Sequence, residues 1–270
     1  MASRIGANVQ EVRVANWNEL NRELFENTWN ESIRRYRSDF VYRGMGDASS
    51  DLRTGLMKLG GNIRAVEFHI LRNFRKYAHE DTVRERSFWN WLAVAQHYGV
   101  PTRLLDWSYS PYVSLHFATE DLKHYSRDGI IWAVNYVAIH KFLPDTMREL
   151  LSEERCNAFT VEMVERAAES LGALEKLSKA PFAVFLEPPS LDQRIVNQFS
   201  IFSMMSSPVD RLDEWLLKEH EELVRRIIIP AEMKWEVRDK LDQANITERV
   251  LFPGLDGLAR WLQRHYTPVA

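Results

Sequence analysis

The chain is poor in cysteine: Cys156 is the one cysteine among 270 residues, so no disulfide can form within it. Such a chain fits a reducing compartment. No stretch approaches the roughly eighteen consecutive apolar residues of a membrane-spanning helix. The N-terminal segment MASRIGANVQEVRV also lacks the apolar core of a secretory signal. We therefore expect a cytoplasmic protein that makes no use of a membrane.

The chain also lacks the short motifs of the commonest nucleotide, metal and hydrolase sites. It has no P-loop and no Gly-x-Gly-x-x-Gly, so nucleotide folds of those two types are not indicated. Zinc-finger, His-Glu-x-x-His and EF-hand spacings are missing, and no metal site is predicted. Without a Gly-x-Ser-x-Gly or protease-like cysteine motif, a nuclease or other hydrolase is the weakest interpretation.

The charge balance excludes a chain that is basic throughout. The net charge is -3, so nucleic acid would have to be bound by a local basic patch. Two short runs place Arg and Lys beside aromatic residues, RRYR at 34–37 and RNFRK at 72–76. Such runs serve single-stranded nucleic acid in some proteins and are solvated helix faces in more of them.

What the chain has in quantity is apolar and aromatic residues, 45% hydrophobic with nine Trp and thirteen Phe, enough for a sizeable core. Hydrophobic periodicity predicts helices and strands in irregular order, which favours an α+β fold: one domain with a mostly antiparallel sheet flanked by helices. The expected helices are 17–38, 62–79, 82–98, 111–125, 145–178, 211–220, 231–244 and 255–265. The expected strands are 39–44, 129–137, 182–187, 199–205 and 224–230.

The stretch QHYGVPTRLLDWSYSP at 96–111 is unusually rich in polar and aromatic residues for a connector. Gly99 suits the end of the preceding helix, and Pro101 prevents its continuation. Ser110 and Pro111 suit the cap and first position of the next helix. The residues between are therefore expected to form a rigid loop able to hold a ligand.

Two interpretations of the polar residues in this loop stay open. Arg103 and Asp106 either face a ligand or form an ion pair that braces the loop. The apolar residues Leu104, Leu105 and Trp107 are expected to pack onto the core.

Arg43 closes an otherwise apolar strand. Side chains alternate along a strand, so Val41 and Arg43 share one face. A guanidinium there suits a phosphate or carboxylate ligand, or else a structural salt bridge, for instance with Asp106. Later, RIVNQFSIF at 194–202 brings Gln198 to the start of a strand, where a Gln most often bonds to backbone.

These residues carry a resemblance to the FRG domain family. FVYRG at 40–44 is similar to the motif that names the family, and the segment 91–119 resembles its longest motif, which includes Gln-His-Tyr-Gly and Pro-Thr-Arg-Leu-Leu-Asp-Trp. RIVNQFSIF and LFPGLDGLARWL (251–262) resemble its later motifs, although the family usually has Gly where Phe199 and Ser200 stand. The resemblance implies a single FRG-type domain over 1–270, with a core at about 36–266 after the N-terminal helix 17–38.

The order of motifs also resembles that of mono-ADP-ribosyltransferases, which implies a core of that type, NAD as substrate and no metal. Arg43 matches the first position of that family's site, and Ser108 and Ser110 match its Ser-x-Ser segment. Gln198 matches the third position, where the usual residue is Glu, and Glu187 is a rival carboxylate.

The resemblance implies a role for each matched residue. Arg43, beside Gly44, grips the NAD phosphates or ribose; Ser108 positions the nicotinamide ribose; and Gln198 holds its hydroxyl. His97 contacts a ribose or serves as base for the acceptor. The remaining residues assigned to NAD binding are Tyr98, Thr102, Arg103, Trp107 and Ser110, with the aromatic ones stacking on nicotinamide.

The acceptor of ADP-ribose is expected to be a macromolecule: RNA, DNA or protein. By analogy with bacterial effectors, the resemblance implies a toxin or phage-defence role, with a neutralising antitoxin as a further partner. The alternative function is a nucleotide-binding or interaction module without catalysis, which the Gln at position 198 favours.

Overall fold

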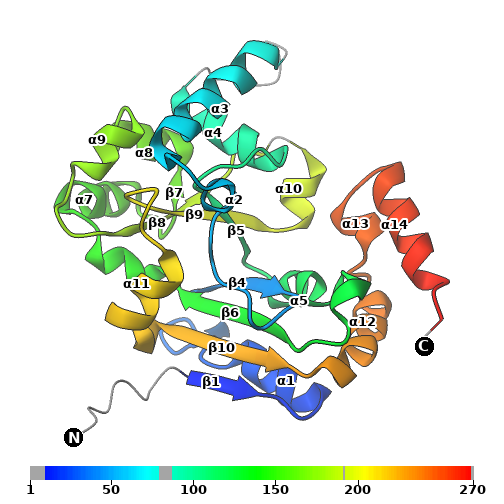
Figure 1. Cartoon of the computed structure of the whole chain (residues 1–270). Coiled ribbons are helices and arrows are strands. Elements are labelled where there is room, and N and C mark those ends of the chain that lie inside the picture. The colour runs from blue at the N-terminus through cyan, green and yellow to red at the C-terminus, as the bar shows by residue number, and fades with distance from the viewer. Residues whose placement is uncertain (1–9, 79–86, 191, 269–270) are drawn as a thin grey trace, which may run out of the picture.

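The computed structural model describes residues 10–78, 87–190 and 192–268 (Figure 1). Eight of its strands form one sheet in the order β1-β10-β6-β4-β5-β9-β8-β7. Their bounds, in that order, are Gln10–Arg13, Val224–Ile229, Gly129–Asn135, Phe40–Met45, Leu105–Ser108, Ser200–Met205, Ala183–Glu187 and Phe159–Thr160. All neighbouring strands are antiparallel except β1 with β10 and β7 with β8. The expected mostly antiparallel sheet flanked by helices is confirmed.

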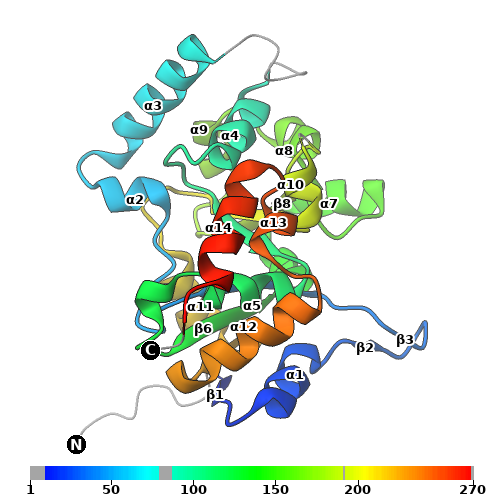
Figure 2. The same cartoon turned by 90° about the vertical axis from the view of Figure 1, so that its right-hand side faces the viewer.

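The helices lie on both faces of the sheet and at its edges. Their bounds are α1 Trp17–Phe25, α2 Gly55–Leu59, α3 Ile63–Tyr77, α4 Phe88–His97, α5 Pro111–Thr119, α6 Tyr136–Ile139, α7 Asp145–Glu154, α8 Val161–Ala167, α9 Leu171–Glu175, α10 Gln193–Asn197, α11 Leu212–Glu219, α12 Lys234–Gln243, α13 Glu248–Leu251 and α14 Leu255–His265. Figure 2 shows α14 running across the front of the molecule, above α12 and α5. None of the helices in the described part of the chain has the length and apolarity that a bilayer crossing requires.

Burial explains why the central strands read as unbroken apolar runs. In β6, Ile131 packs with Leu115 of α5 and Val237 of α12, whereas Ile130 packs on the other face with Trp215 of α11. A strand covered on both faces needs apolar side chains at every position. The core therefore lies in layers on either side of the sheet.

The sheet divides between β4 and β5. These two strands share a single register pair, Tyr42 with Ser108, whereas β4 pairs with β6 along its whole length from Phe40 to Met45. In Figure 1 the half with β4, β6, β10 and β1 lies below the half with β5, β9 and β8. Two strands that part after one pair leave space between them.

The expected helix 17–38 is wrong beyond residue 25. After α1 the chain forms a small antiparallel hairpin from β2 (Trp29–Asn30) and β3 (Arg35–Tyr36). Asn27 and Arg34 have φ of 59° and 51°, in the left-handed region, which cannot continue a right-handed helix. The apolar spacing up to Trp29 continued past the real end of the helix.

The expected helix 145–178 is also wrong as one element. Helix α7 ends where Arg155 turns to a φ of 52°, and β7, α8 and α9 follow. Thr160 caps α8 and Ser170 caps α9 through their hydroxyls, so polar residues inside the run begin new helices.

Smaller differences concern the ends of elements. The start of the expected helix 82–98 lies outside the described residues, and α4 is helical from Phe88. The helix expected to reach residue 125 ends at Thr119, before a short 3₁₀ turn at Leu122–His124. The strand expected at 129–137 ends at Asn135, whose side chain caps α6.

Candidate functional site

A cavity of about 250 Å³ lies where β4 and β5 part. Strands β4 and β5, helix α5 and the α10–β9 connection all contribute to its wall. The lining residues are Tyr42, Arg43, Gly44, Asp106, Trp107, Ser108, Ser114, Phe117, Glu120, Arg194, Gln198 and Ser200. The structure thus brings together three segments that are far apart in the sequence and that include Arg43, Ser108 and Gln198.

The cavity continues into a surface groove of about 780 Å³. The residues common to the two are Arg43, Asp106, Arg194, Gln198 and Ser200. The groove runs past Tyr98 and Pro101 of the loop after α4, and Asp256 of α14 lies on its opposite wall. Cavity and groove form one cleft, large enough for a ligand of cofactor size.

Arg43 stands at the junction of cavity and groove with an unusual set of partners. Its Nη1 donates to the main-chain carbonyl of Asp106, and its buried Nε has no hydrogen-bond partner. Burial lowers the pKa of Arg43, with the Asp106 carboxylate opposing that shift. The suggested ion pair is corrected to a carbonyl contact, because the Asp106 carboxylate accepts instead from Gln96 Nε2 at 2.8 Å.

Ser108 and Gln198 meet across the cavity wall. Ser108 Oγ donates to the Gln198 carbonyl at 2.7 Å and accepts from the Ser110 amide at 2.9 Å. Its proton is committed, so it meets a ligand as an acceptor. The Gln198 side chain donates from Nε2 to the Leu251 carbonyl at 2.9 Å, the backbone role that is usual for Gln in such a position.

Gly44 and Ser110 position helix α5 against the cavity. A Cβ on Gly44 would lie 1.7 Å from the Ser114 carbonyl oxygen, so glycine is required for α5 to approach β4 this closely. Ser110 caps α5 by accepting from the Val113 amide at 3.4 Å. Ser110 does not line the cavity, and its observed role is the cap.

Trp107 and Thr102, both assigned to NAD binding, have their side chains turned into the protein. Trp107 Nε1 donates to Ser203 Oγ at 2.7 Å, and its ring packs edge-on against Phe185. Thr102 Oγ1 donates to Gln96 Oε1 and accepts from the Leu104 amide. The indole nitrogen of Trp107 and the hydroxyl of Thr102 are thus engaged within the fold, although Trp107 is among the residues that line the cavity. Tyr98 is exposed and lines the groove.

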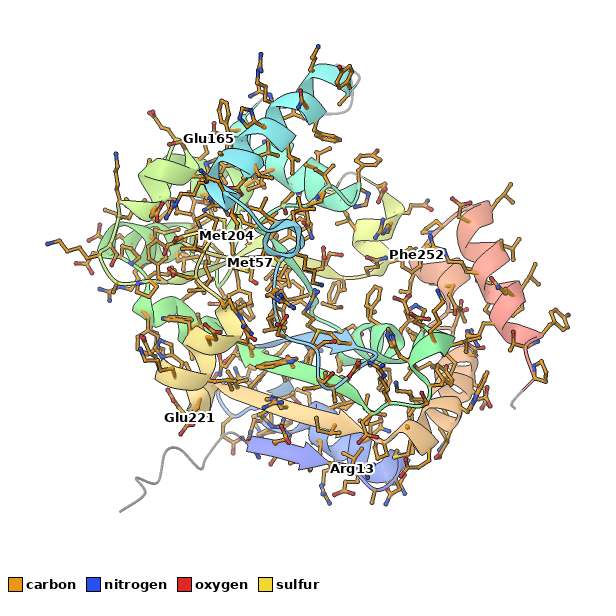
Figure 3. All side chains as sticks on the ribbon, in the orientation of Figure 1. Arg13, Met57, Glu165, Met204, Glu221 and Phe252 are labelled. Atoms are coloured by element: carbon orange, nitrogen blue, oxygen red, sulfur yellow. The ribbon has the colours of Figure 1, made fainter. Side chains whose placement is uncertain are left out.

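Arg103 braces the loop from below, and the expected pairing with Asp106 is wrong. Its Nε and Nη2 donate to the two carboxylate oxygens of Glu67 on α3, at 2.7 and 2.6 Å. Both side chains are almost fully buried. Arg103 lines a small void with Met57 and Met204, which lie close together in Figure 3, and not the cleft. Because its guanidinium is already bonded to Glu67 inside the fold, Arg103 is not placed to hold a ligand.

His97 lies on the groove wall, paired with Asp192. The distance from His97 Nε2 to Asp192 Oδ2 is 2.7 Å. Burial raises the pKa of Asp192, but the bonds from His97 and from the Ile195 and Arg194 amides outweigh it, so the pKa lies below its usual value.

Glu187, the rival carboxylate, accepts from the Tyr109 hydroxyl at 2.9 Å and does not line the cleft.

Glu120 is a cavity carboxylate that the sequence analysis missed. It ends α5, and its Oε2 lies 3.4 Å from Nε2 of the fully buried His116. On the other side of that ring, His116 Nδ1 lies 2.9 Å from Arg238 Nη1. Arginine can only donate, so Nδ1 accepts and the neutral ring carries its proton on Nε2, toward Glu120. Burial lowers the pKa of His116 and so favours that neutral ring.

Arg194 lines the cavity and contacts Phe252, which packs against the rings of α5. The Arg194 guanidinium lies 5.0 Å from the centre of the Phe252 ring, and that ring also meets Phe117 edge-on. Phe252 follows directly after α13 and is labelled in Figure 3. In the described residues no group of three His, Cys, Asp or Glu side chains is placed to hold a metal ion.

Comparison with known proteins finds one match, to the model of a protein family. No curated protein and no solved structure matches the chain, so the ADP-ribosyltransferase-like core stays a prediction. The model of the FRG domain matches residues 38–127, which supply Arg43, Ser108 and Glu120, while Gln198 lies beyond the match. Residues 38–127 therefore match the FRG domain, and β4, β5 and α5 of the cleft lie within the match.

Proposed function

We propose that the cleft binds NAD and that the protein transfers ADP-ribose from it to a macromolecule. The observation that carries the proposal is Arg43, a half-buried residue at the junction of cavity and groove: its guanidinium donates to a main-chain carbonyl, and its buried Nε has no hydrogen-bond partner. Among the described residues no carboxylate forms a salt bridge with it. A cation that is partly removed from water and has no counter-ion favours an anionic ligand.

The shape of the cleft supports a dinucleotide. A diphosphate at Arg43 would have one nucleoside on each side, one in the cavity and the other in the groove. We assign the nicotinamide nucleoside to the cavity, because its polar groups include Ser108, Ser114 and Glu120. The groove offers the exposed ring of Tyr98 to the adenine.

The proposed chemistry breaks the bond between ribose C1′ and the nicotinamide nitrogen, and nicotinamide leaves with the bonding electrons. C1′ becomes positively charged, an acceptor oxygen or nitrogen attacks it, and that atom loses its proton. We assign Glu120, a carboxylate of the cavity lining, to stabilise the positive charge; His116 Nε2 lies 3.4 Å from its Oε2. Glu120 takes the role that the resemblance gave to Gln198 or Glu187.

The alternative, a nucleotide-binding module without catalysis, has one observation in its favour. The amide nitrogen of Gln198 is fixed on the Leu251 carbonyl, so the residue at the third position serves the fold. The same cleft would then recognise a nucleotide and leave it unchanged.

The test measures NAD binding and nicotinamide release separately. The purified protein is titrated with NAD by calorimetry, then incubated with NAD labelled in the adenosine portion and with separate RNA, DNA and protein fractions. We expect binding, nicotinamide release and label on one fraction. Arg43→Ala should abolish all three, whereas Arg148→Ala, which removes an exposed guanidinium paired with Asp145, should change none.

Each other outcome decides between the proposals. Binding without nicotinamide release in any fraction supports the non-catalytic module. Absence of NAD binding contradicts the proposed transferase. By resemblance alone, the proposal extends to a cytoplasmic toxin or phage-defence effector held in check by a neutralising protein.

A further inference from the structure

The β2–β3 hairpin extends away from the rest of the molecule, as Figure 2 shows. It is short: Trp29 pairs with Tyr36 and Asn30 with Arg35, and Arg34 takes the left-handed conformation at the turn. An isolated two-stranded hairpin is marginally stable in water. Its conformation alone therefore does not explain why the chain holds these side chains out in solvent.

One face of the hairpin is aromatic. Trp29 and Tyr36 are cross-strand neighbours with ring centres 5.0 Å apart, in an edge-to-face arrangement. Trp29 is 48% exposed, Tyr36 is 68% exposed, and Ile33 near the turn is 52% exposed. Apolar exposure gathered on one small element is typical of an interaction surface.

The hairpin is also cationic. Arg34, Arg35 and Arg37 are exposed, and none of them forms a salt bridge within the described part of the chain. The one acidic residue between 28 and 37 is Glu31, which accepts from the Trp29 indole nitrogen. The segment thus carries three positive charges and one negative charge in a chain whose net charge is -3. Its charge is opposite in sign to that of the whole molecule.

We propose that the hairpin of residues 28–37 binds single-stranded nucleic acid. Guanidinium groups pair with phosphates, and exposed aromatic rings stack on bases, a combination that suits a strand whose bases are not already paired. Because side chains alternate along β3, Arg35 lies on the face opposite Tyr36. The backbone and the bases of one strand could therefore contact the two faces together. The proposal holds whether or not the cleft turns over NAD.

The test uses fluorescence anisotropy with a labelled oligouridine RNA of about 20 nucleotides, the matching single-stranded DNA and a duplex of the same length. The full chain should bind both single strands more tightly than the duplex. Arg34, Arg35 and Arg37 changed together to Gln should weaken binding at least about tenfold. Log K falls as log salt rises, and in the same variant this slope should become less steep by about 2, because three phosphate contacts on a single strand are lost.

Two matched variants separate this surface from general charge. The first variant changes three lysines that are exposed elsewhere on the molecule, Lys141, Lys176 and Lys179, to Gln. It removes the same charge and should leave the affinity unchanged. The second variant changes the other basic run, Arg72, Arg75 and Lys76 of α3, to Gln, and it should also leave the affinity unchanged. Tyr36→Phe should keep the affinity and Tyr36→Ala should lose it, because stacking needs the ring and not the hydroxyl.

The remaining outcomes contradict the proposal. It fails if the chain binds none of the probes, if the duplex binds best, or if the α3 variant loses binding while the hairpin variant keeps it. A protein that elutes as a dimer, and as a monomer after the hairpin substitutions, would show that a second copy covers this surface instead. Circular dichroism of each variant checks that the fold is kept.

Discussion

Arg43 and Asp106 are joined across the division of the sheet by a hydrogen bond from the guanidinium to the main-chain carbonyl, while the Asp106 carboxylate contacts Gln96. The cation is therefore held in place without being neutralised. A positive charge that is not neutralised costs folding free energy, and it remains able to bind an anionic ligand.

Arg43→Met should separate stability from binding. The substitution removes a charge that burial already disfavours, and keeps a side chain of similar length. We expect the free energy of unfolding to be unchanged or raised by about 1 kcal/mol, measured by urea denaturation, and NAD affinity to fall below detection. A variant that unfolds readily would show that Arg43 serves the fold rather than a ligand.

Glu120→Gln should lower nicotinamide release by about 100-fold while the NAD dissociation constant changes by less than about threefold. The reason is that an amide fills the same space but cannot stabilise a positive charge at C1′. Glu187→Gln is the matched control and should keep full activity, since Glu187 contacts Tyr109 outside the cleft. Equal loss in both variants, or in neither, would contradict the role given to Glu120.

The local elements of the site could be predicted because their causes are local. Gly99, Pro101, Ser110 and Pro111 mark a helix end and a helix start by backbone conformation and capping, and both are found where expected. The expectation of an irregular loop throughout is wrong, because Leu105–Ser108 forms strand β5 by pairing with β9, a partner distant in the sequence. Arg43 is found on the cleft as expected, but it does not end its strand: β4 continues to Met45, and Arg43 pairs with Trp132 within it.

The partners in the site could not be predicted, because tertiary packing chooses them. The partner of Arg103 is Glu67, which precedes it by 36 positions, and no local pattern favours it over Asp106. Glu120 had one sequence signal, its spacing four residues after His116 on a helix. The spacing alone does not show which ring nitrogen of His116 carries the proton. Arg238, from another helix, contacts Nδ1 and so leaves the proton on Nε2.

Glu67→Gln should be strongly destabilising, by about 3–5 kcal/mol, because it leaves the Arg103 guanidinium buried without a counter-ion. Arg64→Gln removes an ion pair between the same helix α3 and Glu175, but that pair is partly exposed, and its loss should cost about 1 kcal/mol or less. Urea denaturation of both variants gives the comparison. Similar losses would contradict the bracing role of Arg103.

Gly44→Ala should destabilise the protein by about 2–3 kcal/mol, because the added methyl group meets the backbone of α5 at Ser114 and Ala118. Backbone cannot move aside as a side-chain tip can. Gly172→Ala is the matched control: it lies in helix α9 with open space around it, so it should stabilise by about 0.5–1 kcal/mol. If Gly44→Ala is as stable as wild type, close helix approach is not what requires glycine at position 44.

His140 predicts how stability depends on pH. Its Nε2 accepts from the Phe185 amide at 2.9 Å, and Nδ1 lies 2.8 Å from the Asn157 carbonyl, so the buried ring is neutral with its proton on Nδ1. Burial lowers the pKa of His140 from 6.5 to about 4. Between those values the unfolded chain binds a proton that the folded protein does not bind, so stability falls as the pH falls.

The loss from His140 should be about 3 kcal/mol, complete by about pH 4 and absent above about pH 7. Burial lowers the pKa of His116 and of His220 as well, so both add to the loss with the same sign. Urea unfolding at a series of pH values between 7.5 and about 4 measures the sum. His140→Gln, whose amide can still donate to Asn157, should flatten the curve but not abolish its slope. Stability that stays constant or rises on acidification would mean that His140 is already protonated in the folded protein, contrary to the hydrogen bond that it accepts from Phe185.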